Sequence, residues 1–429
     1  MTISKYGESI QKYELKINIF LLMMKPFSLL IKPASADCNL RCKYCFYIDH
    51  LENQESAPRM SEETLENMIK SYMSTNQNKQ YSFGWQGGEP TIMGLKFFQK
   101  AVELQMKYAP PGSSISNGLQ TNGTLITDNL AKFLGEYKFL LGVSLDGPKE
   151  IHDHYRTTIN MNPTHDRVMK GIGFLRKHNI EFNILTLVHN VNVKEAKEIY
   201  NYLRDNQFYF HQYIPCVEFD EKGSLKPYSI TGKEWGLFLT EIFNEWVKRD
   251  VNKVSIRLFD SVMEYLVFGR YNVCYMQDSC IQYFVVEHDG GVYPCDFFVR
   301  NNLLLGNINR DSWEELLNSQ TYQVFGSQKS NWNEKCNLCP YLSLCHGDCQ
   351  KFRYGALSTA KKLSSLCQGW KIFYTKTLPR FKTIADNFKK ENNITEPYLF
   401  KFPKFGRNIL CLCGSGKKFK NCCGIHRNN

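Results

Sequence analysis

Residues 37–47 read DCNLRCKYCFY and directly follow an apolar run at 27–31. Cys38, Cys42 and Cys45 are separated by three residues and then by two. Three thiolates this close can share one iron–sulfur cluster, whereas a tetrahedral zinc or a fully ligated four-iron cluster needs a fourth ligand. A four-iron cluster held by three cysteines keeps one iron open, and an open metal position is where substrate or cofactor chemistry takes place. A structural zinc knuckle with a distant ligand, or buried thiols without function, is the alternative.

The composition is that of a globular metalloprotein. A chain of 429 residues is long enough for one large domain and one or two small ones, and 43% hydrophobic and 14% aromatic residues are typical of a packed core. Sixteen cysteines accompany no secretory signal, since the short apolar run within 16–24 follows acidic residues and lacks a cleavage site. No stretch is long enough to span a membrane. Cysteines in a reducing compartment are more often metal ligands or catalysts than disulfide partners, so we expect a cytoplasmic protein.

The formal net charge of +11 is a weak indication of nucleic-acid binding, because the count treats every cysteine as neutral. Three thiolate-ligated clusters would lower it by about five units. The lysines are scattered along predicted helix faces, where a solvated surface explains them. We therefore expect no nucleic-acid partner. We also expect no membrane partner, and we expect a monomer.

Short β-rich runs alternate with amphipathic helical stretches from Phe27 onward. The pattern predicts strands at 28–32, 81–86, 114–121, 139–145, 181–188 and 208–214. It predicts helices at 61–74, 95–108, 127–136, 164–177 and 193–205. Six strand–helix units in sequence indicate the α/β class, with a parallel sheet that curls into a partial (β/α)6 barrel.

Chemistry in such barrels gathers on the loops that follow the C-terminal ends of the strands. The cysteine loop follows the first predicted strand, and Gly87, Gly88, Glu89 and Pro90 follow the second. The loops 121–124 (TNGT) and 144–148 (SLDGP) follow the third and fourth. Each is an ordinary turn signal alone, but together they mark one face of the barrel as the site.

Helix replaces the alternation at 231–270. Its aromatic stripe is more consistent with core packing than with a cofactor site, and consists of Trp235, Phe238, Phe243 and Trp246. A second cysteine-bearing region begins at residue 271. Two β-rich runs, 281–287 and 291–298, meet at Asp289-Gly290 and predict a hairpin with Cys295 and Asp296 on its second strand. A short helix is expected around 312–318.

The spacing of the later cysteines suggests one compact zinc or cluster site. Its expected ligands are Cys336, Cys339, Cys345 and Cys349. Cys274 and Cys280 precede the hairpin, and Cys367 comes after the run. A lone Cys216 after the sixth strand is expected to be a small buried apolar residue.

Both ends of the chain are separate from this pattern. Residues 1–25 have no convincing pattern and form an N-terminal arm, and 384–408 is a charged linker. Residues 409–429 hold two cysteine pairs that can close a four-thiolate tetrahedron suited to zinc: Cys411, Cys413, Cys422 and Cys423.

The first cysteine loop resembles the cluster-binding loop of radical S-adenosylmethionine enzymes, with Tyr44 as the aromatic residue before the last cysteine. The later region resembles the SPASM extension, which carries auxiliary clusters. The tail resembles the SEC-C zinc motif, although Leu412 replaces the usual proline. Over 27–381 the chain closely resembles anaerobic sulfatase-maturating enzymes. The stretches that carry this resemblance are SLLIKPASADCNLRCKYCFY, QGGEP, LQTNGTLI, SLDGPKEIHD, EFNILTLV, VSIRLFD, CDFFV and the final cysteine run.

The resemblance implies a radical SAM partial barrel at 26–230, a helical connection at 231–270 and a SPASM domain at 271–383. It also implies three [4Fe–4S] clusters, the two auxiliary ones with interleaved ligands. One auxiliary set is Cys274, Cys280, Cys295 and Cys349. The other is Cys336, Cys339, Cys345 and Cys367. A zinc-ribbon scaffold is the alternative for this region.

The implied reaction converts a cysteine or serine of a sulfatase to Cα-formylglycine without oxygen, within an unfolded segment of the form C/S-x-P/A-x-R. S-adenosylmethionine on the open iron would yield a radical that removes a Cβ hydrogen, and an auxiliary cluster would take the second electron. A donor such as flavodoxin or ferredoxin would supply the first. The implied cofactor contacts are Tyr44, Gly87, Gly88, Glu89, Ser144 and Arg156. Asp296 is the implied base, with Tyr47 and Gln86 on the substrate side.

Three points stay open. Asp296 could simply bond to backbone donors. Another SPASM-type peptide modification, such as a thioether or carbon–carbon crosslink, is possible, although residues 1–25 are too short for the added leader-binding domain of many such enzymes. A non-catalytic electron carrier or zinc-bound interaction protein would leave the three-cysteine loop and the GGEP turn unexplained.

Overall fold

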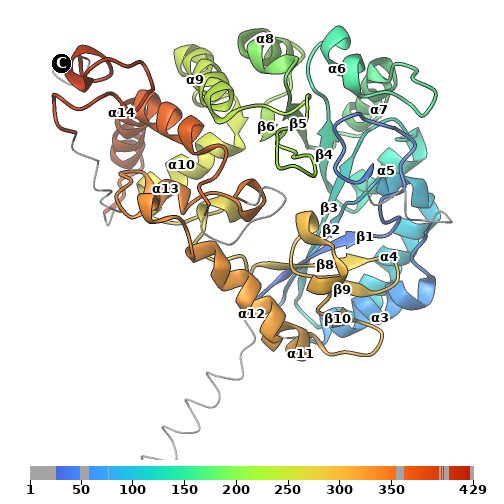
Figure 1. The fold of residues 1–429 in the computed structure, drawn as a ribbon. Coiled ribbons are helices and arrows are strands. Elements are labelled where there is room, and N and C mark those ends of the chain that lie inside the picture. The colour runs from blue at the N-terminus through green and yellow to red at the C-terminus, as the bar shows by residue number, and fades with distance from the viewer. Residues whose placement is uncertain are drawn as a thin grey trace, which may run out of the picture.

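The computed structural model describes residues 26–48, 58–75, 77–353, 362–395, 398, 400 and 405–425 (Figure 1). The predicted N-terminal arm, 1–25, lies outside the described residues. Parts of the predicted linker and residues 426–429 of the tail also lie outside them.

One sheet with the strand order β10-β9-β8-β1-β2-β3-β4-β5-β6-β7 organises the described chain. From β1 to β6 the strands pair in parallel and in chain order, which confirms the predicted α/β partial barrel. The ends of this order, β10 and β7, leave the sheet open. The six predicted strands are β1 (Ser28–Lys32), β2 (Gln80–Trp85), β3 (Ser114–Thr121), β4 (Leu140–Ser144), β5 (Phe182–Val188) and β6 (Phe210–Pro215).

Helices connect these parallel strands. Two of them begin at side-chain caps: the Ser61 and Thr127 side chains accept hydrogen bonds from the N–H groups of Thr64 and Leu130. A further short helix, α6 (Lys149–Tyr155), follows the SLDGP loop and was not predicted. The five predicted helices are α3 (Glu62–Met73), α4 (Gly94–Tyr108), α5 (Asp128–Glu136), α7 (His165–Lys177) and α8 (Ala196–Asp205).

The sheet extends beyond the six predicted strands at both ends. β7 (Ser255–Ile256) pairs with β6, and β8 (Tyr283–Glu287) pairs in parallel with β1. The hairpin of β8 and β9 (Gly291–Tyr293) is confirmed, and β10 (Gly306–Asn307) adds to it. The second-cysteine region therefore shares the barrel's sheet.

The hairpin's second strand is shorter than predicted, and Cys295 and Asp296 do not lie on it. β9 ends at Tyr293 because Pro294 has no N–H to donate to a ladder. Asp296 instead begins the 3₁₀ helix η4 (Asp296–Phe298). The tight turn of this helix directs Asp296 back toward the barrel.

A helical layer covers the far end of the sheet. α9 (Gly232–Arg249), α10 (Arg257–Phe268) and α14 (Cys367–Glu391) lie together in Figure 1. α9 approaches α14 closely, since a Cβ on Gly236 would lie 2.5 Å from the carbonyl oxygen of Gly369. The predicted aromatic stripe is confirmed as core, at 1–3% exposure: Trp235, Phe238, Phe243 and Trp246.

The helix α14 runs to Glu391, past residue 384 where the linker was expected to begin. Among the described helices, none combines the length and the apolar character needed to cross a bilayer.

The segment between the hairpin and α14 carries the remaining cysteines. It contains α11 (Trp313–Asn318), which was predicted, then α12 (Gln320–Ser327) and α13 (Leu342–Cys345). Trp313 Nε1 donates to Ser71 Oγ of α3, which fixes α11 to the barrel. In Figure 1 the segment then passes from the β10 edge toward α14.

Candidate active site

The loop after β1 holds the three cysteines predicted to bind the first cluster. Cys42 is buried, and Cys38 and Cys45 are half-buried. The Leu40 N–H and Asn122 Nδ2 lie 3.4 and 3.6 Å from Cys38 Sγ, so they would stabilise a thiolate there. Burial raises the pKa of Cys38 to about 12 and that of Cys45 to about 11, and the neighbouring thiols add to the rise. Such thiols become thiolates when a metal supplies positive charge, which suits cluster ligation.

Gly87 and Gly88 bring the loop after β2 against the cysteine loop. Gly87 has a φ of +113°, and a Cβ on Gly88 would lie 2.0 Å from the Asp37 carbonyl oxygen. The Gly88 N–H donates to the Ser35 carbonyl at 2.7 Å, and the Glu89 N–H donates to that of Asp37 at 2.8 Å. The glycines thus serve a close approach of two loops. Their contact with the cofactor stays a prediction.

Glu89 ties the second and third loops together. Its Oε1 accepts from Thr91 N, Thr91 Oγ1 and Thr121 Oγ1, and its Oε2 accepts from Asn122 N at 2.6 Å. Burial raises the pKa of this carboxyl, and the four hydrogen bonds oppose the rise. The Glu89 side chain therefore holds the two loops together. The predicted cofactor contact would be made by the backbone around Glu89.

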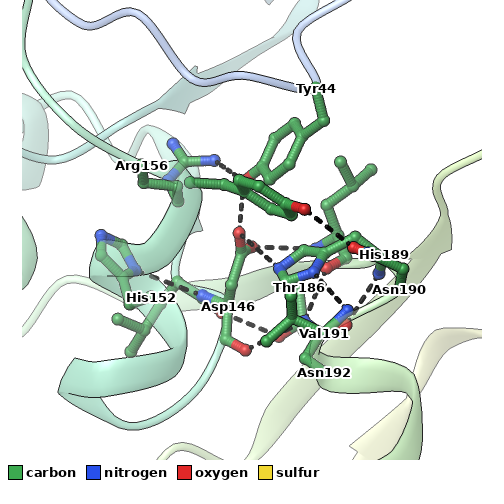
Figure 2. A network of polar contacts seen from close by, with 12 residues as sticks. Tyr44, Asp146, His152, Arg156, Thr186, His189, Asn190, Val191 and Asn192 are labelled. Atoms are coloured by element: carbon green, nitrogen blue, oxygen red, sulfur yellow. Dashed lines mark hydrogen bonds and ion pairs between the residues drawn. The ribbon is translucent and has the colours of Figure 1, made fainter. Parts of the chain in front are cut away.

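Tyr44 sits in a buried polar network (Figure 2). Its hydroxyl donates to Asp146 Oδ2 and accepts from Arg156 Nη1 at 3.0 Å, and His189 stacks on its ring at 5.5 Å. Asp146 is fully buried, and its Oδ1 accepts from the Leu187 N–H. The network thus anchors the residue between two cysteines to β4 and β5.

Two buried donors of this network lack a hydrogen-bond partner within the described chain: Arg156 Nε, and His189 Nε2, which lies 3.9 Å from Asp146 Oδ2. An unpaired buried polar group is costly, so a polar ligand is expected beside the cluster loop. Ser144, another predicted cofactor contact, is half-buried at the C-terminal end of β4. The residues present fit S-adenosylmethionine, although each individual contact stays a prediction. The sequence did not predict a role for Asp146 or His189. The SLDGP pattern predicted only that the loop 144–148 lies at the site.

Asp296, Tyr47 and Gln86 come from three segments and meet in one buried cluster. Tyr47 Oη donates to Asp296 Oδ2 at 2.5 Å, and Gln86 Nε2 donates to the same oxygen at 3.0 Å. The other oxygen, Oδ1, has no hydrogen-bond partner in the described part of the chain. The alternative that Asp296 serves backbone donors is not what the contacts show.

Lys32 and Glu287 complete this cluster and were missed by sequence reasoning. Lys32 Nζ lies 2.6 Å from Glu287 Oε1, 3.8 Å from Asp296 Oδ1 and 4.6 Å from the centre of the Tyr47 ring. Burial raises the pKa of Asp296, and the charge of Lys32 is the main opposing influence. One feature of the sequence could have predicted this cluster: Lys32 ends the apolar strand β1 directly before the cysteine loop.

The later cysteines form two groups that the chain order does not suggest. After burial, the groups that most raise the pKa of Cys349 are Cys295 and Cys274, with Cys280 also contributing. A cavity beside α13 and α14 is lined by the other set, Cys336, Cys339, Cys345 and Cys367. The expectation from spacing, which put Cys349 with Cys336, is therefore wrong, because α14 brings Cys367 into that place. The grouping matches the interleaved sets, and the cluster assignments stay predictions.

A buried lysine lies beside these cysteines. The Lys329 side chain is buried, and its Nζ donates to the carbonyls of Tyr275 and His346. Burial lowers the pKa of Lys329, and Cys345 and Cys280 act in the opposite direction. A buried ammonium among thiols fits thiolate-bound clusters, whose net charge is negative.

The tail brings its four cysteine sulfurs within 4.8 Å of one another. Four sulfurs at about 2.3 Å from a common zinc lie about 3.8 Å apart, so this set fits zinc. Phe405 links the motif to the body, with ring centres 5.0 Å from Phe419 and 6.1 Å from Tyr341. Cys216 is 2% exposed and packs with apolar residues, as expected.

Comparison with protein families gives three matches. Residues 33–203 match the radical SAM superfamily, 274–340 match an iron–sulfur cluster-binding SPASM domain, and 407–425 match the SEC-C motif.

Two curated relatives cover most of the chain. A cysteine-type anaerobic sulfatase-maturating enzyme of Clostridium perfringens is 40% identical over 363 residues, which are 83% of this chain and 98% of that protein. A serine-type enzyme of Bacteroides thetaiotaomicron is 36% identical over 378 residues, 84% of this chain and 90% of that protein. A solved structure of native anSMEcpe with bound AdoMet and Cp18Cys peptide matches with a TM-score of 0.79 and 40% identity, over 84% of this chain and 99% of that one.

Proposed function

The chain belongs to the anaerobic sulfatase-maturating enzymes of the radical SAM superfamily, and from this membership we propose that it converts a cysteine or serine of a sulfatase to Cα-formylglycine without oxygen. The observation that supports the proposal is the Asp296 cluster, because it holds a buried carboxylate beside the cluster loop with one oxygen that has no hydrogen-bond partner in the described chain and could take the substrate proton. Tyr47, beside the cluster loop, donates directly to that base.

The first cluster would be held by Cys38, Cys42 and Cys45, with S-adenosylmethionine beside Tyr44, Arg156 and the loop that begins at Gly87. Once bound, the pair supplies a 5′-deoxyadenosyl radical that takes a hydrogen atom from the substrate Cβ.

Asp296 accepts the thiol or hydroxyl proton in this proposal. Tyr47 and Gln86 hold its Oδ2, so Oδ1 is left to face the substrate. Burial raises the pKa of Asp296, and the charge of Lys32 opposes this rise, so Lys32 favours the ionised form that can take a proton. The substrate loses a hydrogen atom, a proton and an electron. For a cysteine substrate, water then supplies the aldehyde oxygen and sulfide leaves.

The second electron needs an acceptor close to this base. Cys295 precedes Asp296 in the chain, and its Sγ accepts a hydrogen bond from Tyr283 Oη at 3.4 Å. The proposed ligand sets give three [4Fe–4S] clusters, two of them fully ligated and suited to electron transfer. The tail would hold one zinc.

We extend the proposal to the surroundings of the reaction. The substrate is an unfolded segment of the form C/S-x-P/A-x-R, the electron donor is a flavodoxin or ferredoxin, and the enzyme acts as a monomer. Sixteen cysteines without a disulfide in the described chain favour the cytoplasm.

The test is to incubate the reduced, reconstituted protein with S-adenosylmethionine and CxPxR or SxPxR peptides. Mass spectrometry should show formylglycine, with loss of the thiol from the cysteine peptide. An unchanged peptide despite formation of 5′-deoxyadenosine would favour another SPASM-type modification.

The role of the base is tested by Asp296→Asn. We expect 5′-deoxyadenosine formation to continue and formylglycine formation to fall by about 100-fold or more, because general-base catalysis contributes about that much. Asp289→Asn is the matched control, since Asp289 lies in the hairpin turn and accepts from the Gly291 N–H. Full turnover in Asp296→Asn would remove Asp296 from the mechanism.

A further inference from the structure

We propose that Glu218, Phe46 and Phe297 form a subsite for a cationic substrate side chain, which the Lys351 ammonium occupies in the free protein. This inference rests on the proposed function, because it assigns the subsite to the arginine of the C/S-x-P/A-x-R segment. It makes Glu218 a specificity-determining residue.

Three side chains, those of Glu218, Phe46 and Phe297, form a cage around the positive charge of Lys351. Lys351 Nζ lies 2.5 Å from Glu218 Oε1, 4.8 Å from the centre of the Phe46 ring and 4.3 Å from that of Phe297. The two rings lie 5.1 Å apart and are tilted by 59°. A carboxylate beside two aromatic faces is a general recognition site for cations.

The cage lies between the radical-generating loop and the base. Phe46 follows Cys45, Phe297 follows Asp296, and Glu218 comes from the loop after β6. Glu218 is among the charges that raise the pKa of Cys45, after burial and Cys42, so the carboxylate is near the cluster loop. A peptide that presents its reactive Cβ between this loop and Asp296 therefore passes the cage.

The cage is accessible and its carboxylate is held in place. The side chains of Lys351 and Glu218 are 16% and 20% exposed, whereas those of Lys32 and Glu287 are 2% and 8% exposed. The Glu218 N–H donates to Ser229 Oγ at 2.8 Å, and the same hydroxyl donates to the Glu218 carbonyl oxygen at 3.0 Å. The carboxylate thus stays in position when its cation is exchanged.

A substrate arginine can replace the resident lysine. A guanidinium is planar and weakly hydrated, binds a carboxylate through two N–H groups and stacks on aromatic faces. An ammonium is a compact, strongly hydrated charge on a flexible stem, so Lys351 loses less on release to water. Lys351 keeps the cage filled until the peptide arrives.

The test is a double-mutant cycle between Glu218→Gln and the substrate arginine. The peptides are identical CxPxR sequences that carry arginine or its neutral isostere citrulline. Binding to the reconstituted protein with S-adenosylmethionine is measured by fluorescence anisotropy, and kcat and KM are measured alongside. The wild type should bind the arginine peptide about 10- to 100-fold more tightly than the citrulline peptide. Glu218→Gln should remove most of this preference and change citrulline-peptide binding little.

Lys351→Met provides the second variant, because it removes the resident cation and keeps the stem. It should strengthen arginine-peptide binding and retain the preference over citrulline. An arginine preference that persists in Glu218→Gln would overturn the proposal. Equal weakening of the binding of both peptides in Lys351→Met would also overturn it, because Lys351 would then have only a structural role. These binding results decide the subsite even if no formylglycine forms, whereas absence of formylglycine with wild-type binding would contradict the proposed function instead.

Discussion

The buried pair of Lys32 and Glu287 makes a quantitative prediction possible. Lys32→Met would leave two buried carboxyls, Glu287 and Asp296, without the ammonium that lies 2.6 and 3.8 Å from them. The side chains of the pair are 2% and 8% exposed, so water cannot replace the lost charge. Breaking such a buried pair costs about 3–5 kcal/mol. The midpoint of urea unfolding, followed by tryptophan fluorescence, should fall accordingly.

The same change should lower turnover through Asp296. Burial raises the pKa of this carboxyl and Lys32 opposes the rise, so without Lys32 the pKa increases. A base works only above its pKa, and the acid limb of the formylglycine rate should therefore move to higher pH in Lys32→Met. Raising the pH should restore part of the rate, while 5′-deoxyadenosine formation stays close to that of the wild type.

The double variant Lys32→Met, Glu287→Met separates the two effects. It removes both charges of the pair and fills the space with apolar side chains, a replacement that is often neutral for stability. Stability should largely return. Turnover should recover only in part, because the loss of Lys32 raises the pKa of Asp296 more than the loss of the Glu287 charge lowers it. A stability loss below about 1 kcal/mol in Lys32→Met, typical of exposed pairs, would refute the reasoning. A wild-type pH profile in that variant would refute the link to Asp296.

Three further predictions concern the metal sites. Gly88→Ala should abolish S-adenosylmethionine cleavage and lower the iron content by about one cluster, because the new Cβ would lie 2.0 Å from the Asp37 carbonyl oxygen. Intact cleavage would show that the loop can move. Lys329→Met should lower the iron content measured by absorption spectroscopy and iron analysis, because the buried ammonium lies among cysteines of both later groups. Full iron loading would show that Lys329 balances no cluster charge. Cys413→Ser should reduce bound zinc and leave the iron content unchanged, because the tail sulfurs form a separate set; zinc retention by mass spectrometry would contradict this assignment.

The alternating pattern of strands and helices could be predicted from sequence because it depends on short-range periodicity. β1 and β3 have the predicted bounds, and α3 and α5 begin at the side-chain caps Ser61 and Thr127. Each of these features is set by neighbours within a few residues. The local pattern also predicts the hairpin, but its second strand ends earlier than predicted, at Tyr293, because Pro294 has no N–H to continue the ladder.

The contacts across the fold could not be predicted in this way. The pairing of β8 with β1 joins segments far apart in sequence, and nothing in either run specifies the other. The same holds for Cys349, whose neighbours in space are Cys295 and Cys274 although Cys345 is closer in the chain. Spacing predicts a metal site well when the ligands share one loop, as in the tail. It fails when α14 supplies a ligand from elsewhere.

The β8–β1 pairing has a chemical consequence beyond the fold. Its register places Lys32 opposite Glu287 at the C-terminal ends of two parallel strands, next to the cysteine loop and to the segment that carries Cys295 and Asp296. A two-electron oxidation of the substrate needs a proton acceptor and an electron acceptor at nearly the same place. Here the proposed base and a proposed cluster ligand are adjacent in the chain, and one strand pair fixes both against the radical-generating loop. A displacement of the hairpin would therefore impair proton and electron removal together, and leave cleavage of S-adenosylmethionine to the other loops of the barrel.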